Sequence, residues 1–160
     1  MYKPASLRQH LTHASPDLKQ NPDKLLVFAD QGKIIASGTT SLSFEYHYRL
    51  TIIVTDYSGD PDAIMVPLLA WVAVHQTELL NNPDLRQTGI QFDVDFNNHQ
   101  TMDLSIALDL NERTVVKRCN DGKLQLSHPQ EPQITPDFQH PFWKLYKDKN
   151  LLAEWVTPNE

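Results

Sequence analysis

The chain has 160 residues and a formal net charge of −6 at pH 7, with 14 Lys and Arg against 20 Asp and Glu. That length fits one domain with a sizeable core, and the acidic balance excludes a surface built to neutralise the phosphates of duplex nucleic acid. The single cysteine, Cys119, excludes an internal disulfide framework. Since no stretch is apolar enough for a signal peptide or a membrane span, we expect a protein made in the cytosol.

The first 40 residues predict two short helices followed by two extended segments. Residues 6–14 form a weakly amphipathic helix that Ser6 can cap, and a second helical turn ends before Pro22. Residues 24–30 form an apolar run typical of a strand. Gly32 suggests a turn that leads to a second extended piece over residues 33–37.

The longest alternating segment in the sequence covers residues 42–56. Its even positions are apolar or aromatic, from Leu42 to Val54, while its odd positions are mostly polar. This period of two predicts a strand with one buried face. Globular strands usually have about 3–10 residues, so we expect one end to project beyond the sheet or to bend at a bulge.

A long apolar helix is predicted to follow this strand. Asp60 and Pro61 suit the N-cap and the first helical position. Apolar residues then recur at helical spacing as far as Leu80, which predicts a largely buried helix that stops before Pro83. Pro67 lies inside this helix, where we expect it to remove a hydrogen bond and bend the axis.

Two hairpins are predicted in the next part of the chain. Residues 90–97 and 101–110 alternate between apolar and polar positions, which predicts the clearest hairpin in the sequence. Residues 114–118 and 123–127 form a second pair, and the Asp-Gly dipeptide between them favours a tight turn.

The expected architecture is α+β, a mainly antiparallel sheet with two principal helices packed on one face. Residues 1–128 form the single domain, and residues 129–141, which contain four prolines, form a linker. Residues 142–157 form a C-terminal β-hairpin with Trp143 and Trp155. Because an isolated hairpin is marginally stable, we expect it to dock on the domain or on a neighbouring subunit.

Oxygen ligands alternate at the start of the predicted helix, at Asp56, Ser58, Asp60 and Asp62, as in the first part of a calcium loop. The twelfth position of such a loop needs a bidentate glutamate, and here it is Pro67. Capping of the helix by these acids is therefore the better interpretation.

Four aspartates share the polar face of the predicted central hairpin: Asp93, Asp95, Asp103 and Asp109. A solvated face is the commonest cause of this pattern, and a charged interface is an alternative. The histidines form no ligand cluster, and no glycine-rich phosphate loop occurs. We expect no catalytic, cofactor or metal residues, and a part of an assembly rather than an enzyme.

Several segments together resemble the tail completion protein R family of P2-like contractile-tailed phages. The longest matching pieces are residues 41–50, 54–60 and 66–71, and shorter ones are residues 3–8, 21–23 and 111–114. The resemblance covers residues 1–118 and, weakly, the terminal hairpin.

This resemblance implies a tail terminator-like protein of the virion tail, assembled in the host cytoplasm. It would cap the head-proximal end of the tail, stop tail polymerisation and prepare the tail for joining to the head. The implied partners are copies of itself in a closed, commonly six-fold ring and the tail tube, sheath or neck proteins, with no membrane and no sequence-specific nucleic acid. A small cytosolic enzyme or ligand-binding domain remains the alternative.

We expect the long strand to take part in the ring. Its exposed edges would suit sheet augmentation between subunits. The half nearer Asp56 should lie in the core, and the half nearer Leu42 should meet another subunit. The expected contact residues are Glu45, His47, Arg49, Trp143 and Trp155.

Overall fold

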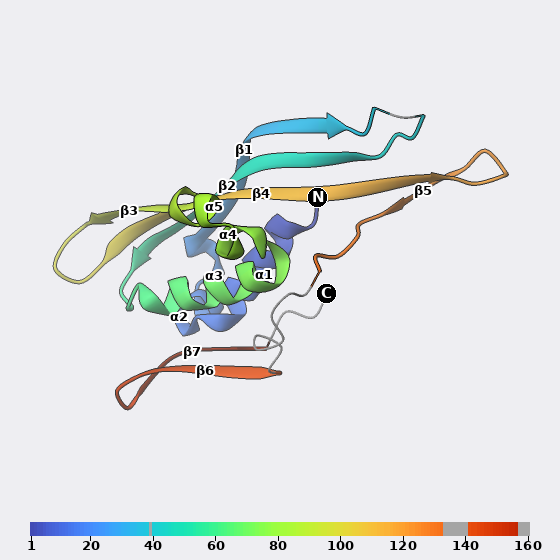
Figure 1. Cartoon of the computed structure of the whole chain (residues 1–160). Coiled ribbons are helices and arrows are strands. Elements are labelled where there is room, and N and C mark those ends of the chain that lie inside the picture. The colour runs from blue at the N-terminus through green and yellow to red at the C-terminus, as the bar shows by residue number, and fades with distance from the viewer. Residues whose placement is uncertain (39, 133–140, 157–160) are drawn as a thin grey trace.

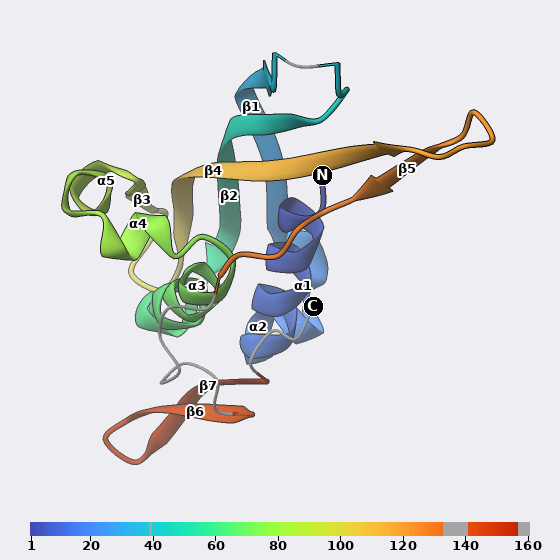
Figure 2. The same cartoon turned by 45° about the vertical axis from the view of Figure 1, so that its right-hand side comes forward.

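An antiparallel sheet, a layer of helices and a terminal hairpin are stacked in that order in the computed structural model (Figure 1, Figure 2). The structure describes residues 1–38, 40–132 and 141–156. The helices are α1 (Lys3–Ala14), α2 (Pro16–Gln20), the 3-10 turn η1 (Pro22–Lys24), α3 (Asp62–His75), α4 (Glu78–Asn81) and α5 (Pro83–Thr88). The strands are β1 (Leu25–Ala36), β2 (Phe44–Tyr57), β3 (Ile90–Phe96), β4 (Met102–Arg118), β5 (Leu124–Ser127), β6 (Phe142–Lys147) and β7 (Asn150–Val156). The predicted α+β class is confirmed.

The main sheet has the strand order β1-β2-β4-β3, and β5 pairs with the far end of β4. All of these pairs are antiparallel, and Leu50 lies opposite Leu108 where β2 and β4 meet. The even residues of β2 and β4 face the helices and form the core. The predicted alternation of residues 42–56 is therefore confirmed, although the strand begins at Phe44.

Strand β2 lies inside the sheet, so the expectation that it offers exposed edges is wrong. It pairs with β1 on one side and with β4 on the other over nearly its whole length. The predicted bulge is present at the Asp56 end, where Asp56 has φ 52° and the register shifts between Val54 and Tyr57. Leu42, just before the strand, is exposed.

The turn predicted at Gly32 is a β-bulge inside one continuous strand. Gln31 has φ 50°. The pairing of β1 with β2 is interrupted after Asp30 and resumes at Lys33 in a shifted register. Because the bulge accommodates the extra residues, both halves of β1 keep their hydrogen bonds to β2.

Strand β4 is also one strand of 17 residues, where two separate strands were predicted. The polar residues after Leu110 interrupt the apolar alternation but not the backbone pairing, which continues as far as Thr114 opposite Phe44. Strand β2 pairs with this polar stretch along one edge and holds it extended, although local propensity assigns a break there.

Helix α3 ends at His75, five residues earlier than the predicted helix. Gln76 leaves the helical conformation with φ −146°, and its side chain bonds to Asn111 of β4. Pro83 starts α5 instead of ending a helix, because the Asn82 side chain accepts a hydrogen bond from the backbone N of Asp84.

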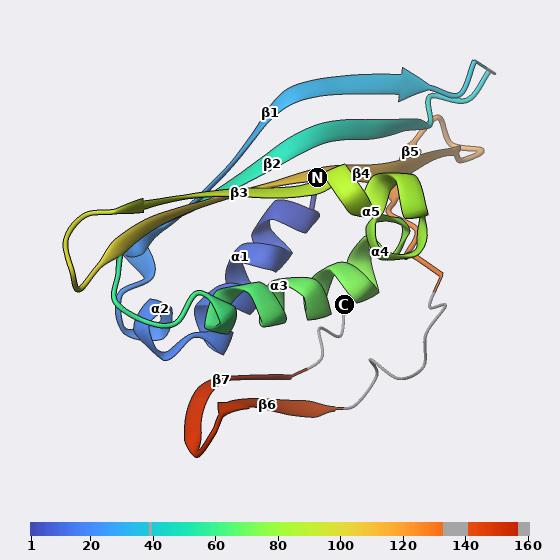
Figure 3. The ribbon, with the colours of Figure 1, turned by 60° about the vertical axis from the view of Figure 1, so that its left-hand side comes forward.

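The two principal helices, α1 and α3, pack on one face of the sheet as predicted (Figure 3). The indole N of Trp71 donates a 3.0 Å hydrogen bond to Ser6 Oγ and so joins them. His10 Nε2 donates a 2.9 Å bond to the carbonyl of Pro67, inside α3. No helix among the described residues is long and apolar enough to cross a membrane.

The hairpin of β6 and β7 docks on the outer side of the helix layer (Figure 3). Ala153 and Trp155 of β7 are buried against Ala14 and Ala63, and Lys147 lies 2.6 Å from Asp60. The hairpin was expected to dock either on its own domain or on a neighbouring subunit, and in the structure it docks on its own domain. Most of the expected linker, residues 133–140, and residue 157 lie outside the described residues.

Candidate functional site

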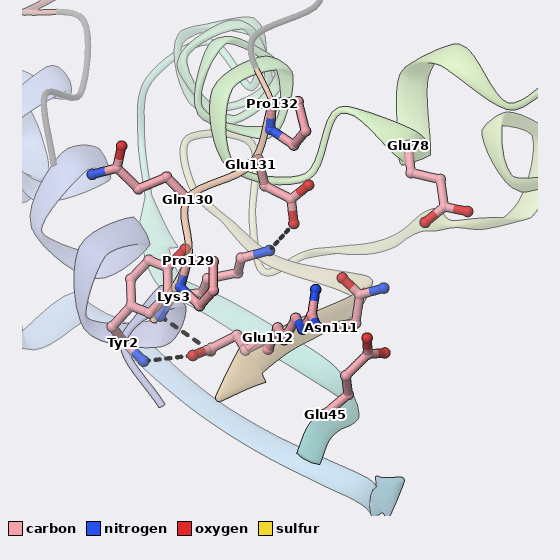
Figure 4. Close-up of a pocket in the computed structure, with 11 residues that line it drawn as sticks. Tyr2, Lys3, Glu45, Glu78, Asn111, Glu112, Pro129, Gln130, Glu131 and Pro132 are labelled. Atoms are coloured by element: carbon pink, nitrogen blue, oxygen red, sulfur yellow. Dashed lines mark hydrogen bonds and ion pairs between the residues drawn. The ribbon is translucent and has the colours of Figure 1, made fainter. Parts of the chain in front are cut away.

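A charged residue stands in the core-facing row of β4. Glu112 continues the even positions that include Leu108 and Leu110, and its exposed fraction is 2 %. Its carboxylate accepts hydrogen bonds from the backbone N of Tyr2 at 2.7 Å and the backbone N of Lys3 at 3.1 Å (Figure 4). It also accepts a hydrogen bond from the hydroxyl of Tyr48. These donors satisfy a buried carboxylate that would otherwise be strongly unfavourable.

Lys3 connects this carboxylate to two further elements. Its exposed fraction is 1 %, and its Nζ donates to Gln76 Oε1 at 2.7 Å and lies 3.2 Å from Glu131 Oε1. Burial lowers the pKa of Lys3, while the charges of Glu131 and Glu112 oppose that shift. The polar cluster thus joins the start of α1, the end of α3, strand β4 and residues 129–132.

A pocket of ≈ 310 Å³ lies over this cluster (Figure 4). Its lining residues come from the N-terminus, the polar stretch of β4 and the segment after β5: Tyr2, Lys3, Glu45, Glu78, Asn111, Glu112, Arg113, Pro129, Gln130, Glu131 and Pro132. Lys3 and Glu112 bond to groups of their own chain. The arrangement ties the N-terminus to the sheet.

His75 lies on the apolar side of the same cluster. Its ring is 4.7 Å from the ring of Trp71 and 6.4 Å from that of Tyr2, measured between centroids. Its Nε2 is buried with no hydrogen-bond partner among the described residues. Burial, with smaller contributions from Lys3 and His10, lowers the pKa of His75 to about 4.

The expected contact residues separate into two groups in the structure. His47 Nε2 lies 3.1 Å from Glu45 Oε2. The guanidinium of Arg49 donates hydrogen bonds to Asp109 Oδ1 at 3.0 Å and to Gln91 Oε1 at 2.7 Å. These three residues share one face of β2.

Trp143 and Trp155 lie opposite each other in the terminal hairpin, beyond the helix layer. Trp155 is buried against its own domain, so its side chain is engaged within the chain. The structure therefore brings Trp143 and Trp155 together with each other, but not with the group on β2.

The Asp60 side chain bonds the first residue of α3, although the N-cap residue of this helix is Pro61, one position later than predicted. Asp60 Oδ1 accepts a 3.0 Å hydrogen bond from the backbone N of Asp62, and its Oδ2 lies 2.6 Å from Lys147. The hydrogen bond from Lys147 lowers the pKa of Asp60.

Within residues 1–38, 40–132 and 141–156, no group of three His, Cys, Asp or Glu side chains could hold a metal ion.

The buried cluster of Lys3, Gln76 and Glu112 was not foreseen from the sequence. The burial of Glu112 could have been predicted, because it follows Leu108 and Leu110 at the next alternate position of the strand. This signal was missed because the strand was expected to end at Leu110. Lys3 carries no such signal, since only the tertiary fold brings it to β4.

The sheet keeps three edge strands, β1, β3 and β5, each of which pairs with one strand only among the described residues. These features define an α+β protein with a pocket bonded to its own N-terminus and with three edge strands among the described residues. The chain belongs to the family of the P2 phage tail completion protein R (GpR), which matches residues 1–132. Over 155 residues it is 41 % identical to the tail completion protein R of Escherichia phage P2, which covers 97 % of this chain and 99 % of that protein. No solved structure matches the chain.

Family membership confirms the resemblance drawn from residues 41–50 and the shorter segments. The chain is a phage tail completion protein, a structural component rather than an enzyme.

Proposed function

We propose that this protein completes the tail by capping its head-proximal end as a closed, six-fold ring. The ring stops further addition of tail subunits and presents a new surface for joining to the head. The observation that carries the proposal is the 41 % identity to the tail completion protein R of phage P2 over nearly the whole of both chains. Its partners in this role are other copies of the chain, the tail tube or sheath, and the neck.

The free strand edges support self-association. Edge strands present unpaired backbone groups that another chain can pair with. A closed ring needs a heterologous contact, in which two different surfaces of each copy meet. The edges of β1, β3 and β5 offer several different surfaces on one molecule.

The outer face of β2 is a second proposed contact. Glu45, His47 and Arg49 form ion pairs or hydrogen bonds on this face, which is opposite to the row of even residues that forms the core. Charge reversal in the variant Arg49→Glu should weaken the oligomer in analytical ultracentrifugation. An unchanged oligomer would argue against this part of the contact.

We also propose that residues 1–128 are the assembly domain, that residues 129–141 are its linker and that residues 142–157 are an appendage. The family match ends at residue 132, before the hairpin begins. The main core cluster of the domain is formed without residues of β6 or β7.

The test is electron microscopy of tails made by a phage in which the gene for this chain is deleted. We expect overlong or defective tails, or tails that fail to join heads, and recovery when the wild-type protein is supplied. Normal infectious particles without the protein would refute the proposed function.

A further inference from the structure

The two ends of β4 carry opposite charges. The strand reaches both ends of the sheet, with β3 beside one end and β5 beside the other (Figure 1). Residues 90–109 contain four aspartates and neither lysine nor arginine. Residues 113–123 contain four basic residues and a single acid, Asp121.

Strand β3 has one acidic and one aromatic face. Asp93 and Asp95 are exposed on the face that continues the odd residues of β4. Phe92 and Phe96 lie on the other face with exposed fractions of 63 % and 76 %, because the helices do not cover this edge. Two phenylalanines this exposed on an edge strand are typical of a contact surface.

The arm formed by β5 and the end of β4 repeats this pattern with the opposite charge. Leu124 and Leu126 have exposed fractions of 52 % and 64 %. Leu126 pairs with Val116, an even residue of β4, so these leucines lie on the same face of the sheet as Phe92 and Phe96. Lys117 is exposed on the face formed by the odd residues of β4. Lys123, just before β5, is also an odd residue and belongs to the same face.

We infer that β5 of one copy pairs edge to edge with β3 of a second copy. Side chains alternate in a strand, so a register that sets the leucines beside the phenylalanines also sets Lys117 and Lys123 on the face of Asp93 and Asp95. Both faces are then complementary at once. This contact rests on the proposed function, since it names the surfaces through which tail-completing copies join.

The charge pattern identifies a second copy as the occupant. The two complementary halves lie at opposite ends of one strand in the same chain. The half of the β1 edge that precedes the bulge is a poorer match for β3, because its exposed Leu26 and Phe28 pair with odd residues of β2. In an extended sheet they would lie on the face of Asp93 and Asp95, where apolar groups would lie beside carboxylates.

Charge exchange between two variants tests the contact in the full-length protein. The variant Asp93→Lys/Asp95→Lys reverses the acidic edge, and Lys117→Glu/Lys123→Glu reverses the basic arm. Lys123 also lies 2.7 Å from Asp121, although both side chains are exposed. Sedimentation velocity at low salt over a range of protein concentrations is the readout, with circular dichroism to verify folding.

Wild type is expected to associate, each variant alone is expected to remain monomeric at the same concentration, and an equimolar mixture is expected to associate again. The mixture recovers because each reversed surface meets an oppositely charged surface on the other variant. The apolar variant Phe92→Ser/Phe96→Ser should also be monomeric. Matched controls of equal charge change, Asp23→Lys/Glu154→Lys and Lys19→Glu/Lys149→Glu, should associate as wild type does.

Four results would overturn the inference: a wild type that is monomeric throughout, reversed variants that associate normally, a mixture that does not recover, or controls as impaired as the edge variants. Edge variants that self-associate normally but fail to complete tails would assign these surfaces to another tail protein, which also overturns it. The outcome is independent of the gene-deletion phenotype. Normal tails without the protein refute the proposed function, whereas an unchanged oligomer refutes this contact alone.

Discussion

The carboxylate of Glu112 accepts a 2.7 Å hydrogen bond from the backbone N of Tyr2, 110 residues earlier in the chain. It binds the backbone N of Lys3 and the hydroxyl of Tyr48 as well. One side chain on the central sheet therefore fixes where α1 begins. Several consequences of this and of the neighbouring packing can be measured.

Replacement of Glu112 by alanine should lower the free energy of unfolding by about 3 kcal/mol, because buried donors that lose their acceptor cost about 1–3 kcal/mol each. Three donors, on Tyr2, Lys3 and Tyr48, lose their partner. Urea unfolding followed by circular dichroism measures the change. The exposed Glu154→Ala is the control and should change stability by less than about 0.5 kcal/mol. Equal stability of the two variants would contradict the role of Glu112.

Stability should fall as the pH drops from about 6.5 to about 4, because the pKa of His75 is lowered to about 4 in the folded chain. In this window the unfolded chain binds the proton that the folded chain excludes, so acid favours unfolding. The loss is on the order of 2–3 kcal/mol from His75, and His10, whose pKa burial also lowers, adds to it. Urea midpoints measured across this pH range test the slope.

The variant His75→Phe isolates that contribution. Phenylalanine keeps the ring contacts with Trp71 and Tyr2 and does not titrate. We expect the variant to fold and to lose less stability in acid than wild type. A pH dependence identical to that of wild type would assign the slope to other groups.

Gly89 should not tolerate alanine. An added Cβ would lie 2.7 Å from the carbonyl oxygen of Leu85 and would clash with the Leu79 side chain. We expect Gly89→Ala to destabilise the domain by about 1–3 kcal/mol, the usual range for overpacking. Gly32→Ala is the matched control, since its Cβ would meet its nearest atoms at 3.9 Å. Thermal melts that showed the two variants to be equally stable would contradict the close approach at Gly89.

A chain that ends at residue 132 should still fold cooperatively. The main core cluster contains no residue of β6 or β7, and Glu131 is retained to pair with Lys3. The truncation exposes Ala14 and Ala63, so a modest loss of stability is expected. A urea transition that stays sigmoidal supports the proposed domain boundary. A gradual, non-cooperative transition would show that the hairpin is part of the folding unit.

Patterns within short segments were sufficient for most strands. The alternation in β2 and in the first part of β4 predicted which residues face the core, because a period of two depends only on local backbone geometry. Asp60 predicted the start of α3 to within two residues, because the hydrogen bond from the backbone N of Asp62 to its side chain involves only neighbouring residues.

Strand ends and helix ends were less predictable, because they depend on partners far away in the chain. Residues 31–32 look like a turn, yet β2 holds them in a bulge. The polar residues after Leu110 look like a break, yet β4 continues through them because it stays paired with β2. Helix α3 stops at His75 where Gln76 turns to bond Asn111, a contact that no local propensity encodes.

The sequence by itself determined the fold class, the buried face of the long strand and membership of the tail completion family, since these depend on residue type and spacing. Only the tertiary structure decided that β2 lies inside the sheet, that Glu112 holds the N-terminus and that β3 and β5 are edge strands at opposite ends of β4. These features arise when strands distant in the chain pair. Hydrogen bonding between such strands selects one partner for each edge, and side-chain periodicity alone contains no information about which partner that is.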